Sequence, residues 1–225
     1  MIENQVKDYY NKISKQYDEH RFSRAYYRRI AEIESEFVLS KVRGGGSVLE
    51  IGPGTGRFSA QMVHKASHVT AIDISQNMLD QLHLKVPAQN LSTQCLSIYE
   101  LATLPGYGDF DAVICMRVLP HLENPLLALE LMSGAVNPKG DVVFDFWNLN
   151  SYVGLVRWLF RRPSFVYTKY YTYPAMLSLI DQSGLKVNDV FAWGYPRLGK
   201  YSLDKPGNNF FKSLGYSLVF HGNRK

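Results

Sequence analysis

The chain has 225 residues, of which 46% are hydrophobic and 20% are charged. These values are typical of a globular domain and exclude a disordered chain, a coiled coil and a collagen-like fibre. No apolar run approaches the ~20 residues that a membrane-spanning helix needs, and the polar N-terminus lacks the apolar core of a secretory signal. We therefore expect a soluble, cytoplasmic protein. Two cysteines, Cys95 and Cys115, are too few for a disulfide framework or a four-ligand zinc site, so we predict no bound metal.

Charge is distributed unevenly along the chain. Residues 47–150 have 5 basic and 10 acidic side chains, whereas residues 151–225 have 11 basic and 3 acidic ones. A basic final third is typical of a surface that meets an anionic substrate, an acidic lipid surface or a nucleic acid, but also of an ordinary solvated face. Charge alone does not choose among these.

The N-terminal part of the chain predicts helices. Apolar and aromatic side chains recur there at spacings of three or four, which is the period of one helix face. The first helix has Val6, Tyr9, Tyr10, Ile13 and Tyr17, and the second has Ile30, Ile33, Phe37, Val38 and Val42. The run Gly44–Gly46 should end the second helix.

After residue 46 the pattern changes to short apolar runs that alternate with amphipathic stretches. Short, continuously apolar strands separated by helices indicate a parallel sheet covered on both faces. We therefore predict a Rossmann-like, doubly wound α/β core. The predicted core strands are Ser47–Ile51, His68–Ile72, Phe110–Cys115 and Asp141–Phe146.

Residues 147–173 interrupt this alternation with a segment rich in aromatic and basic side chains, which we interpret as an inserted cap. A short amphipathic helix with Tyr152 and Leu159 should end at Pro163. The aromatic residues Tyr152, Trp158 and Phe165 either form a small core under the cap or face an acceptor molecule, and packing is the favoured interpretation. The last helix, Pro174–Ser183, and two strands, Leu185–Trp193 and roughly Ser213–Phe220, should follow.

The most informative segment is a glycine-rich loop between a strand and a helix. The sequence runs from Glu50 through glycines at 52, 54 and 56 to Arg57. Such glycines allow sharp turns and let a ligand approach the backbone, and the free N–H groups of the next helix then face that ligand. A dinucleotide loop reads G-x-G-x-x-G, and here Arg57 stands where that pattern has its third glycine. Glu50 would repel a pyrophosphate but could accept hydrogen bonds from a ligand ammonium.

This E-x-G-x-G-x-G loop after a strand resembles motif I of class I S-adenosylmethionine-dependent methyltransferases. Later motifs in the correct order extend the resemblance over residues 47–146. It implies a seven-stranded, mostly parallel sheet with a helical N-terminal lid over residues 1–46, a cofactor-binding domain over residues 47–225 and S-adenosylmethionine as cofactor. The implied cofactor-binding residues are Glu50, Gly52, Gly54, Gly56, Asp73, Ile74, Met78, Ser97, Ile98, Arg117 and Val118, with Tyr17 from the N-terminal helix.

The resemblance implies roles for individual positions, and Arg117 and Val118, in the loop after the fourth strand, should contact the methionine part of the cofactor. Asp73, at the end of the second strand, should chelate the ribose hydroxyls, although it or Ser75 could instead serve as a helix cap. Met78 should lie near the adenine. Many relatives have an aspartate on the adenine amino group, and here Ser97 occupies that position as a weaker acceptor. Ile98 could carry the adenine by its backbone and by stacking.

The segment from Tyr9 to Asp18 resembles the Y-x-x-x-A-x-x-Y-D helix of small-molecule and quinone methyltransferases. This resemblance implies that the helix covers the cofactor and that Tyr17 reaches the site. Ordinary packing of Tyr17 is the alternative, and Arg21 is a weaker candidate for the site.

Methyl transfer from a sulfonium needs no metal, and a base is required only for a protonated nucleophile. His121, just after the fourth strand, is the histidine expected at the mouth of the site and the candidate base. A structural role or a substrate contact is the alternative.

The predicted function is methyl transfer to a small-molecule or lipid-like acceptor, with contact between the basic aromatic cap and a membrane surface as a further option. One alternative is a non-catalytic cofactor-binding or scaffold protein. The other is a nucleotide-dependent oxidoreductase, which the glycine spacing disfavours. Nucleic acid is disfavoured because no recognisable RNA-binding module is present. The identity of the acceptor and the oligomeric state stay open.

Overall fold

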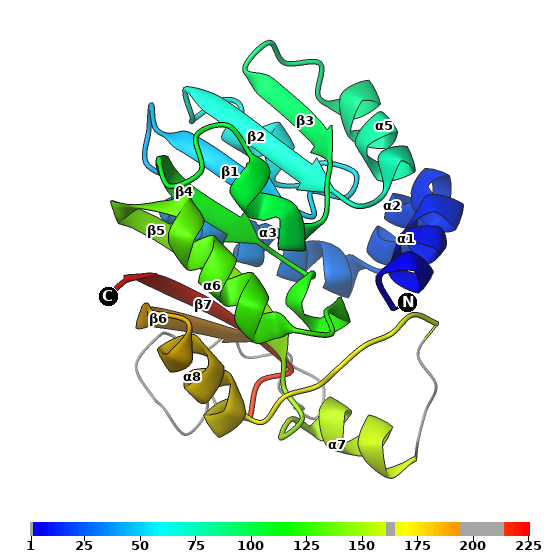
Figure 1. Cartoon of the computed structure of the whole chain (residues 1–225). Helices are drawn as coiled ribbons and strands as arrows, with labels where there is room; N and C mark the ends of the chain where they lie inside the picture. The colour runs from blue at the N-terminus through cyan, green and yellow to red at the C-terminus, as the bar shows by residue number, and fades with distance from the viewer. Residues whose placement is uncertain (1, 161–164, 194–213) are drawn as a thin grey trace.

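The computed structural model describes residues 2–160, 165–193 and 214–225, and the statements of structure below refer to these ranges. One sheet has seven strands in the order β3-β2-β1-β4-β5-β7-β6 (Figure 1). In chain order they are β1 (Ser47–Ile51), β2 (His68–Asp73), β3 (Leu91–Cys95), β4 (Phe110–Cys115), β5 (Val136–Trp147), β6 (Leu185–Trp193) and β7 (Ser217–Arg224). Strands β1 to β5 pair in parallel, whereas β7 runs antiparallel to both β5 and β6. The predicted doubly wound α/β core is confirmed.

Helices precede, connect and follow these strands. The α-helices are α1 (Ile2–Ile13), α2 (Tyr17–Phe22), α3 (Ala25–Ser40), α4 (Ser59–Met62), α5 (Gln76–Lys85), α6 (Pro125–Ala135), α7 (Tyr152–Leu159) and α8 (Tyr173–Gln182). Three 3-10 helices, η1 (Ser14–Gln16), η2 (Ile98–Thr103) and η3 (Leu119–His121), lie between them. None of the described helices has the length and apolar character required to span a bilayer.

Hydrophobic side chains fill both faces of the sheet, as expected for strands that are buried on two sides. Helices α6 and α8 cover the face turned to the viewer in Figure 1, with Leu129 and Ile180 in the core. Helices α3, α4 and α5 cover the other face with Val38, Met62 and Leu82. The sheet is therefore the middle layer of three, and a ligand has access only at its edges or ends.

The N-terminal residues divide into two parts that pack differently. Helix α3 belongs to the core, because Ile30 and Val38 are buried against the sheet. Helices α1 and α2 lie instead beside α5, beyond the ends of the strands (Figure 1). Helix α3 ends at Ser40, and the chain then turns through Gly45, whose φ of 77° favours glycine.

Two predicted strand boundaries were wrong. Strand β5 begins at Val136, five residues before the predicted start at Asp141, and its register with β4 shifts next to Phe110. Strand β7 spans Ser217–Arg224, so it begins after Ser213, which lies outside the described residues, and continues beyond Phe220. In β7, pairing with β6 extends the ladder through polar residues to Arg224, whereas the added residues of β5 pair with β4 only between Val136 and Phe110.

The helix predicted in the cap is present, but the predicted packing of its aromatic side chains is wrong. Helix α7 spans Tyr152–Leu159, and the predicted stop at Pro163 lies outside the described residues. The expected core under the cap is not formed by Tyr152 and Phe165, whose side chains are 61% and 93% exposed. The side chain of Trp158 is outside the described part of the structure. Residues 165–172 run beneath the N-terminal helices (Figure 1).

Candidate functional site

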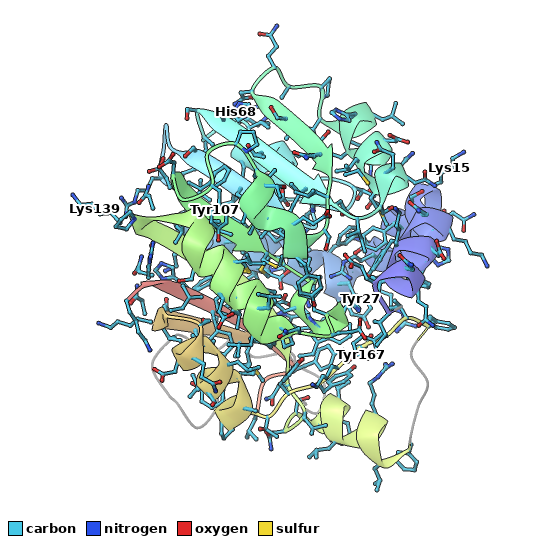
Figure 2. All side chains as sticks on the ribbon, viewed as in Figure 1. Lys15, Tyr27, His68, Tyr107, Lys139 and Tyr167 are labelled. Carbon is cyan, nitrogen blue, oxygen red and sulfur yellow. The ribbon has the colours of Figure 1, made fainter. Side chains whose placement is uncertain are left out.

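A cavity opens at the carboxyl ends of β1, β2 and β4, and side chains of α1 and α2 contribute to its wall. It encloses about 1090 Å³, its open mouth included. The strand order reverses direction between β1 and β4, and ligands of open α/β sheets bind at such a switch point. Figure 2 shows Lys15, on the N-terminal helices, and Lys139, near the start of β5, on opposite sides of the molecule.

Most of the predicted site residues line this cavity. They are Tyr17, Gly52, Gly54, Asp73, Ile74, Met78, Ile98, Arg117, Val118 and His121. Arg21, the weaker candidate, lines it too. Glu50, Gly56 and Ser97 do not belong to the lining. The structure therefore brings together segments that are far apart in the sequence, and it gives three predicted residues other surroundings.

The glycine loop has three positive φ angles, each with its own consequence. They are 69° at Gly52, 57° at Gly54 and 91° at Gly56. A Cβ on Gly52 would lie 2.2 Å from Val118, and one on Gly56 would lie 2.4 Å from Leu82. These two glycines permit close packing. A Cβ on Gly54 would meet only the ring of Tyr17, at 4.0 Å, so this glycine keeps the cavity open.

Asp73 is fixed at the end of β2 by two main-chain amides. Gly54 N donates to Oδ2 at 3.2 Å and Ser75 N donates to Oδ1 at 2.9 Å. Burial raises the pKa of Asp73 to about 6, although both hydrogen bonds favour the ionised form. The carboxylate thus lines the cavity in a fixed orientation with acceptor capacity left, as the predicted ribose contact requires.

Ser75 has the capping role that the sequence left open for it. Its hydroxyl accepts from Met78 N at 3.2 Å and caps α5. Met78 and Ile74 line the cavity on this side, with Ile98 facing it from η2. The apolar surroundings predicted for an adenine are therefore present.

Ser97 acts as a helix cap in the structure. Its hydroxyl accepts from Tyr99 N at 3.2 Å, and Ser97 N donates to the Glu100 carboxylate at 3.3 Å, so the two residues form a capping box. The predicted hydrogen bond from adenine to Ser97 stays a prediction, because the residues that reach the cavity here are Leu96, Ile98 and Tyr99.

Glu50 is enclosed behind the glycine loop. Its side chain accepts a hydrogen bond from the Ser59 hydroxyl, and the residue is 2% exposed. Burial raises the pKa of Glu50 to about 7, against the opposing effects of Ser59 and Arg57. Its contact with a ligand ammonium stays a prediction.

A buried ion cluster that the sequence analysis missed lies at the wall of the cavity. Glu34 of α3 is 0% exposed and pairs with Arg117 and, at 2.6 Å, with Arg57. Burial alone would raise the pKa of Glu34, but the two arginines hold it at about 2. Asp145 of β5 adds a further carboxylate 3.4 Å from the Arg117 guanidinium. Glu34 lies four residues from both Ile30 and Val38, on the same buried face of the helix. An acidic residue on an apolar helix face was therefore the sequence signal that could have revealed the cluster.

Arg117 also has unusual backbone geometry. Among the described residues it is the one non-glycine residue with a positive φ, 66°, and its N–H donates to Asp145 at 2.6 Å. Its side chain lines the cavity while its guanidinium is bound to Glu34 and Asp145. The predicted contact of Arg117 with the methionine part of the cofactor stays a prediction.

His121 lies on η3, is 6% exposed, and is held from two sides. Its Nδ1 is 2.7 Å from the carbonyl oxygen of Tyr167, and its Nε2 is 3.1 Å from the hydroxyl of Tyr10. Because a carbonyl only accepts, Nδ1 carries the proton and Nε2 of the neutral ring accepts from Tyr10. Figure 2 labels Tyr167 on the segment beneath the N-terminal helices. Burial lowers the pKa of His121, so the neutral ring predominates near pH 7.

Two polar residues attach the N-terminal helices to the cofactor side of the cavity. Asn11 Oδ1 accepts from the Ser75 hydroxyl at 2.7 Å, and Asn77 donates to the Asn11 carbonyl at 3.1 Å. Asp18 accepts from the Thr55 hydroxyl at 2.5 Å and pairs with a lysine of α5. Tyr10, Asn11 and Asp18 were overlooked as separate site residues, although all three lie in the Tyr9–Asp18 motif.

The sheet order, the glycine loop and the carboxylate at the end of β2 together define the class I S-adenosylmethionine-dependent methyltransferase fold. Residues 49–144 match a family model described as "Methyltransferase domain". A ubiquinone biosynthesis O-methyltransferase of Aromatoleum aromaticum is 31% identical over 170 residues, covering 71% of this chain and 72% of that protein. The chain belongs to the class I S-adenosylmethionine-dependent methyltransferase family.

Other curated relatives match over a shorter stretch. A ubiquinone biosynthesis O-methyltransferase of Dechloromonas aromatica is 36% identical over 109 residues, which are 47% of this chain and 46% of that protein. The aligned part of this chain thus spans about half the length of several relatives. Family membership follows from these matches, whereas the acceptor does not.

Solved structures extend the similarity over the whole fold. A methyltransferase of Thermotoga maritima has a TM-score of 0.74 at 16% identity and covers 100% of both chains. The N-methyltransferase NodS of Bradyrhizobium japonicum, solved with S-adenosyl-L-homocysteine, has a TM-score of 0.70 at 16% identity, covering 98% of both chains. At such identities the similarity concerns the fold. S-adenosylmethionine is the cofactor of the family, and the open space at Gly54 and the fixed Asp73 carboxylate fit it.

Proposed function

We propose that the protein methylates a hydroxyl group on an aromatic small-molecule or lipid-like acceptor, with S-adenosylmethionine as methyl donor. The observation that carries the proposal is the His121 ring in the cavity wall, with Nε2 already accepting a hydrogen bond from a phenol, that of Tyr10. A phenolic acceptor is protonated at neutral pH and needs a base, and a neutral histidine supplies one. The O-methyltransferase names of the relatives from Aromatoleum and Dechloromonas agree with this chemistry.

In this proposal the cofactor occupies the cavity between the glycine loop and α1. Asp73 accepts hydrogen bonds from the ribose hydroxyls, and Met78 and Ile98 enclose the adenine. Gly52, Gly54 and Val118 shape the wall beside the methionine part, and Tyr17 covers it from α2. When bound, the cofactor supplies an electrophilic methyl group. The chain's own contribution is to orient both ligands and to exclude water.

Calorimetric titration with S-adenosylmethionine, S-adenosylhomocysteine and NADH tests the cofactor assignment. We expect micromolar binding of the two sulfur ligands and none of NADH. Assays with catechol as acceptor, read as formation of S-adenosylhomocysteine, then test turnover. Binding without turnover on any phenol would favour a non-catalytic cofactor-binding protein, and lack of binding would contradict the proposal.

We further propose that α1 and α2 act as a lid and that the cap docks on an anionic membrane surface to admit a lipid-like acceptor. The cap presents exposed Leu155, Leu159, Phe160 and Phe165 beside basic Arg157. An amphipathic helix with this composition binds the lipid interface by apolar insertion and by attraction to anionic headgroups.

Co-sedimentation with phosphatidylglycerol vesicles tests the docking surface. The double change Leu155→Glu and Leu159→Glu should reduce vesicle binding at least tenfold, because it places two charges on the inserting face. Leu84→Glu is the matched control, since Leu84 is 77% exposed on α5, away from the cap. Equal binding of all three proteins would contradict membrane docking and leave the cofactor assignment unaffected.

A further inference from the structure

Tyr10 connects the N-terminal helix with His121. Its hydroxyl is the hydrogen-bond donor to Nε2, and the two rings meet edge to face with centroids 5.8 Å apart. Both residues line the cavity, although they are 111 positions apart in the sequence. The lone pair of the candidate base is therefore already satisfied by a side chain that itself faces the ligand space.

We propose that Tyr10 is a catalytic residue, which takes the proton of the acceptor hydroxyl while it passes its own proton to Nε2 of His121. This inference rests on the proposed function and deepens it, because it makes the N-terminal helix a part of the acid–base machinery. It also favours acceptors whose reacting group is a hydroxyl, since that group must donate a hydrogen bond to the Tyr10 oxygen.

The relay balances in protons and charge. The acceptor oxygen forms a bond to the methyl carbon of the cofactor, whose carbon–sulfur bond breaks with both electrons remaining on sulfur. The acceptor proton moves to the Tyr10 oxygen, and the former Tyr10 proton moves to His121 Nε2. The products are a methyl ether, a neutral thioether and a histidinium that returns its proton to solvent. Tyr10 is a neutral phenol before and after the step.

The surroundings of both residues favour a relay over displacement of Tyr10 by the acceptor. Asn11, the next residue on α1, is hydrogen bonded to Ser75 and Asn77, which holds this turn of the helix against α5. The carbonyl of Tyr167 holds the other side of the His121 ring and keeps its proton on Nδ1. Because both Tyr10 and His121 are held in place, the Tyr10 hydroxyl stays between Nε2 of His121 and the open cavity.

The charges around the pair are compatible with this proton path. Burial raises the pKa of Tyr10, so its proton stays in place until His121 accepts it. The groups that face His121 are Tyr10 on α1, Arg21 on α2, Arg117 after β4, Trp147 on β5 and the Tyr167 carbonyl after α7. The two arginines and burial disfavour a lasting histidinium, which helps the ring to release its proton after each turnover.

The test compares Tyr10→Phe with Tyr9→Phe on two acceptors at pH 8. Catechol is protonated at this pH, whereas the hydroxyl para to the nitro group of 4-nitrocatechol is ionised, and its methylation needs no base. We expect Tyr10→Phe to lower kcat with catechol at least about 100-fold, as removal of an acid–base group does, but less than about threefold with 4-nitrocatechol. Tyr9→Phe removes an equivalent hydroxyl from the neighbouring ring and should retain the activity of the unmodified protein on both acceptors.

A readout without turnover completes the test. In the cofactor-free protein with ¹⁵N-labelled histidine, His121 should show a protonated Nδ1, and Tyr10→Phe should shift the Nε2 resonance alone; His121→Gln identifies the signals. An equal loss of kcat on both acceptors, or an unmoved Nε2 resonance, would overturn the relay while the proposed function stands. If the unmodified protein binds the cofactor but methylates neither acceptor, the proposed function fails and the relay with it.

Discussion

The cofactor side and the acceptor side of the cavity are built in different ways. On the cofactor side, main-chain amides of Gly54 and Ser75 hold Asp73, and all three residues lie between the end of β1 and the start of α5. On the acceptor side, His121 receives its contacts from Tyr10, 111 residues away, and Tyr167, 46 residues away. Local backbone geometry thus makes one side, and long-range side-chain contacts make the other. The cofactor side is therefore recognisable from a contiguous sequence motif, whereas the acceptor side depends on how distant segments pack together.

Glu34 gives the largest expected effect, because it joins the two sides through Arg57 of the glycine loop and Arg117 after β4. Glu34→Gln removes the buried carboxylate that two largely buried arginines share, leaves Arg117 with Asp145 alone, and should cost about 3–5 kcal/mol of unfolding free energy. Urea denaturation at pH 7 measures it. Glu32→Gln on the same helix is the control, since the Glu32 side chain is 59% exposed and should change stability little. A loss of under 1 kcal/mol for Glu34→Gln would show that the cluster does not couple the two sides.

Gly54→Val should disturb the cofactor side of the cavity and leave the acceptor side unchanged. The new side chain would project into the cavity from a position with a φ of 57°, so both space and backbone disfavour it. Calorimetry should detect a loss of S-adenosylmethionine affinity of more than about 100-fold, or about 2.7 kcal/mol. Gly44→Val should bind normally, since a Cβ at Gly44 has no atom within 4 Å. Unchanged affinity for the Gly54 variant would contradict the assignment of the glycine loop.

Substitution of Asp73 tests whether this one side chain on the cofactor side binds the ribose hydroxyls. Asp73→Ala should reduce affinity by about 1.5–3 kcal/mol, the value of hydrogen bonds to a charged group. Because the pKa of Asp73 is about 6, affinity should also fall as the pH decreases through 6, when the carboxylate takes up a proton. The Ala variant should lack this pH dependence, and Asp80→Ala, at an exposed position of α5, should retain it. A loss of less than threefold would remove Asp73 from the ribose site.

Asn11 should have the smallest effect, because it acts on the cofactor side only through the attachment of α1. Asn11→Ala removes the side-chain bonds from the Ser75 hydroxyl and from Asn77 N, while the bond from the Asn77 side chain to the Asn11 carbonyl remains, and it should weaken S-adenosylmethionine binding by about 1 kcal/mol, roughly fivefold. Stopped-flow measurement should place most of the change in the dissociation rate. The neighbouring exposed Lys12, changed to Ala, is the control. Equal dissociation rates for both variants would mean that α1 does not retain the cofactor.

Much of the fold and the cofactor side could be predicted from the sequence because both depend on local patterns. Continuous apolar runs identified the core strands, and the glycine spacing identified the loop. The polar extension of β5 from Val136 could not be predicted, since it has no apolar run and its one strand pair joins Val136 to Phe110 of β4. Ser97 was assigned by position in a motif, whereas its hydroxyl caps the helix that follows it.

On the acceptor side, the sequence identified His121 but not its partners. Nothing in the local pattern around Tyr167 indicates that its carbonyl meets a histidine from another loop, because a backbone carbonyl has no residue-specific signal. Tyr10 was visible in its motif, but its partner depended on where α1 lies relative to η3. Glu34 was discernible as a charge at a buried helical position, yet its two arginines come from distant loops.

The carbonyl of Tyr167 has a consequence for the engineering of substrate preference. The segment that a designer would exchange to admit a different acceptor also supplies the atom that keeps the His121 proton on Nδ1. A replacement loop without a carbonyl at this place would free the ring to change tautomer and direct an N–H, instead of a lone pair, at Tyr10. In the proposed function, acceptor preference and proton chemistry therefore depend on the same segment, and a grafted loop has to reproduce one main-chain oxygen in addition to the shape of the pocket.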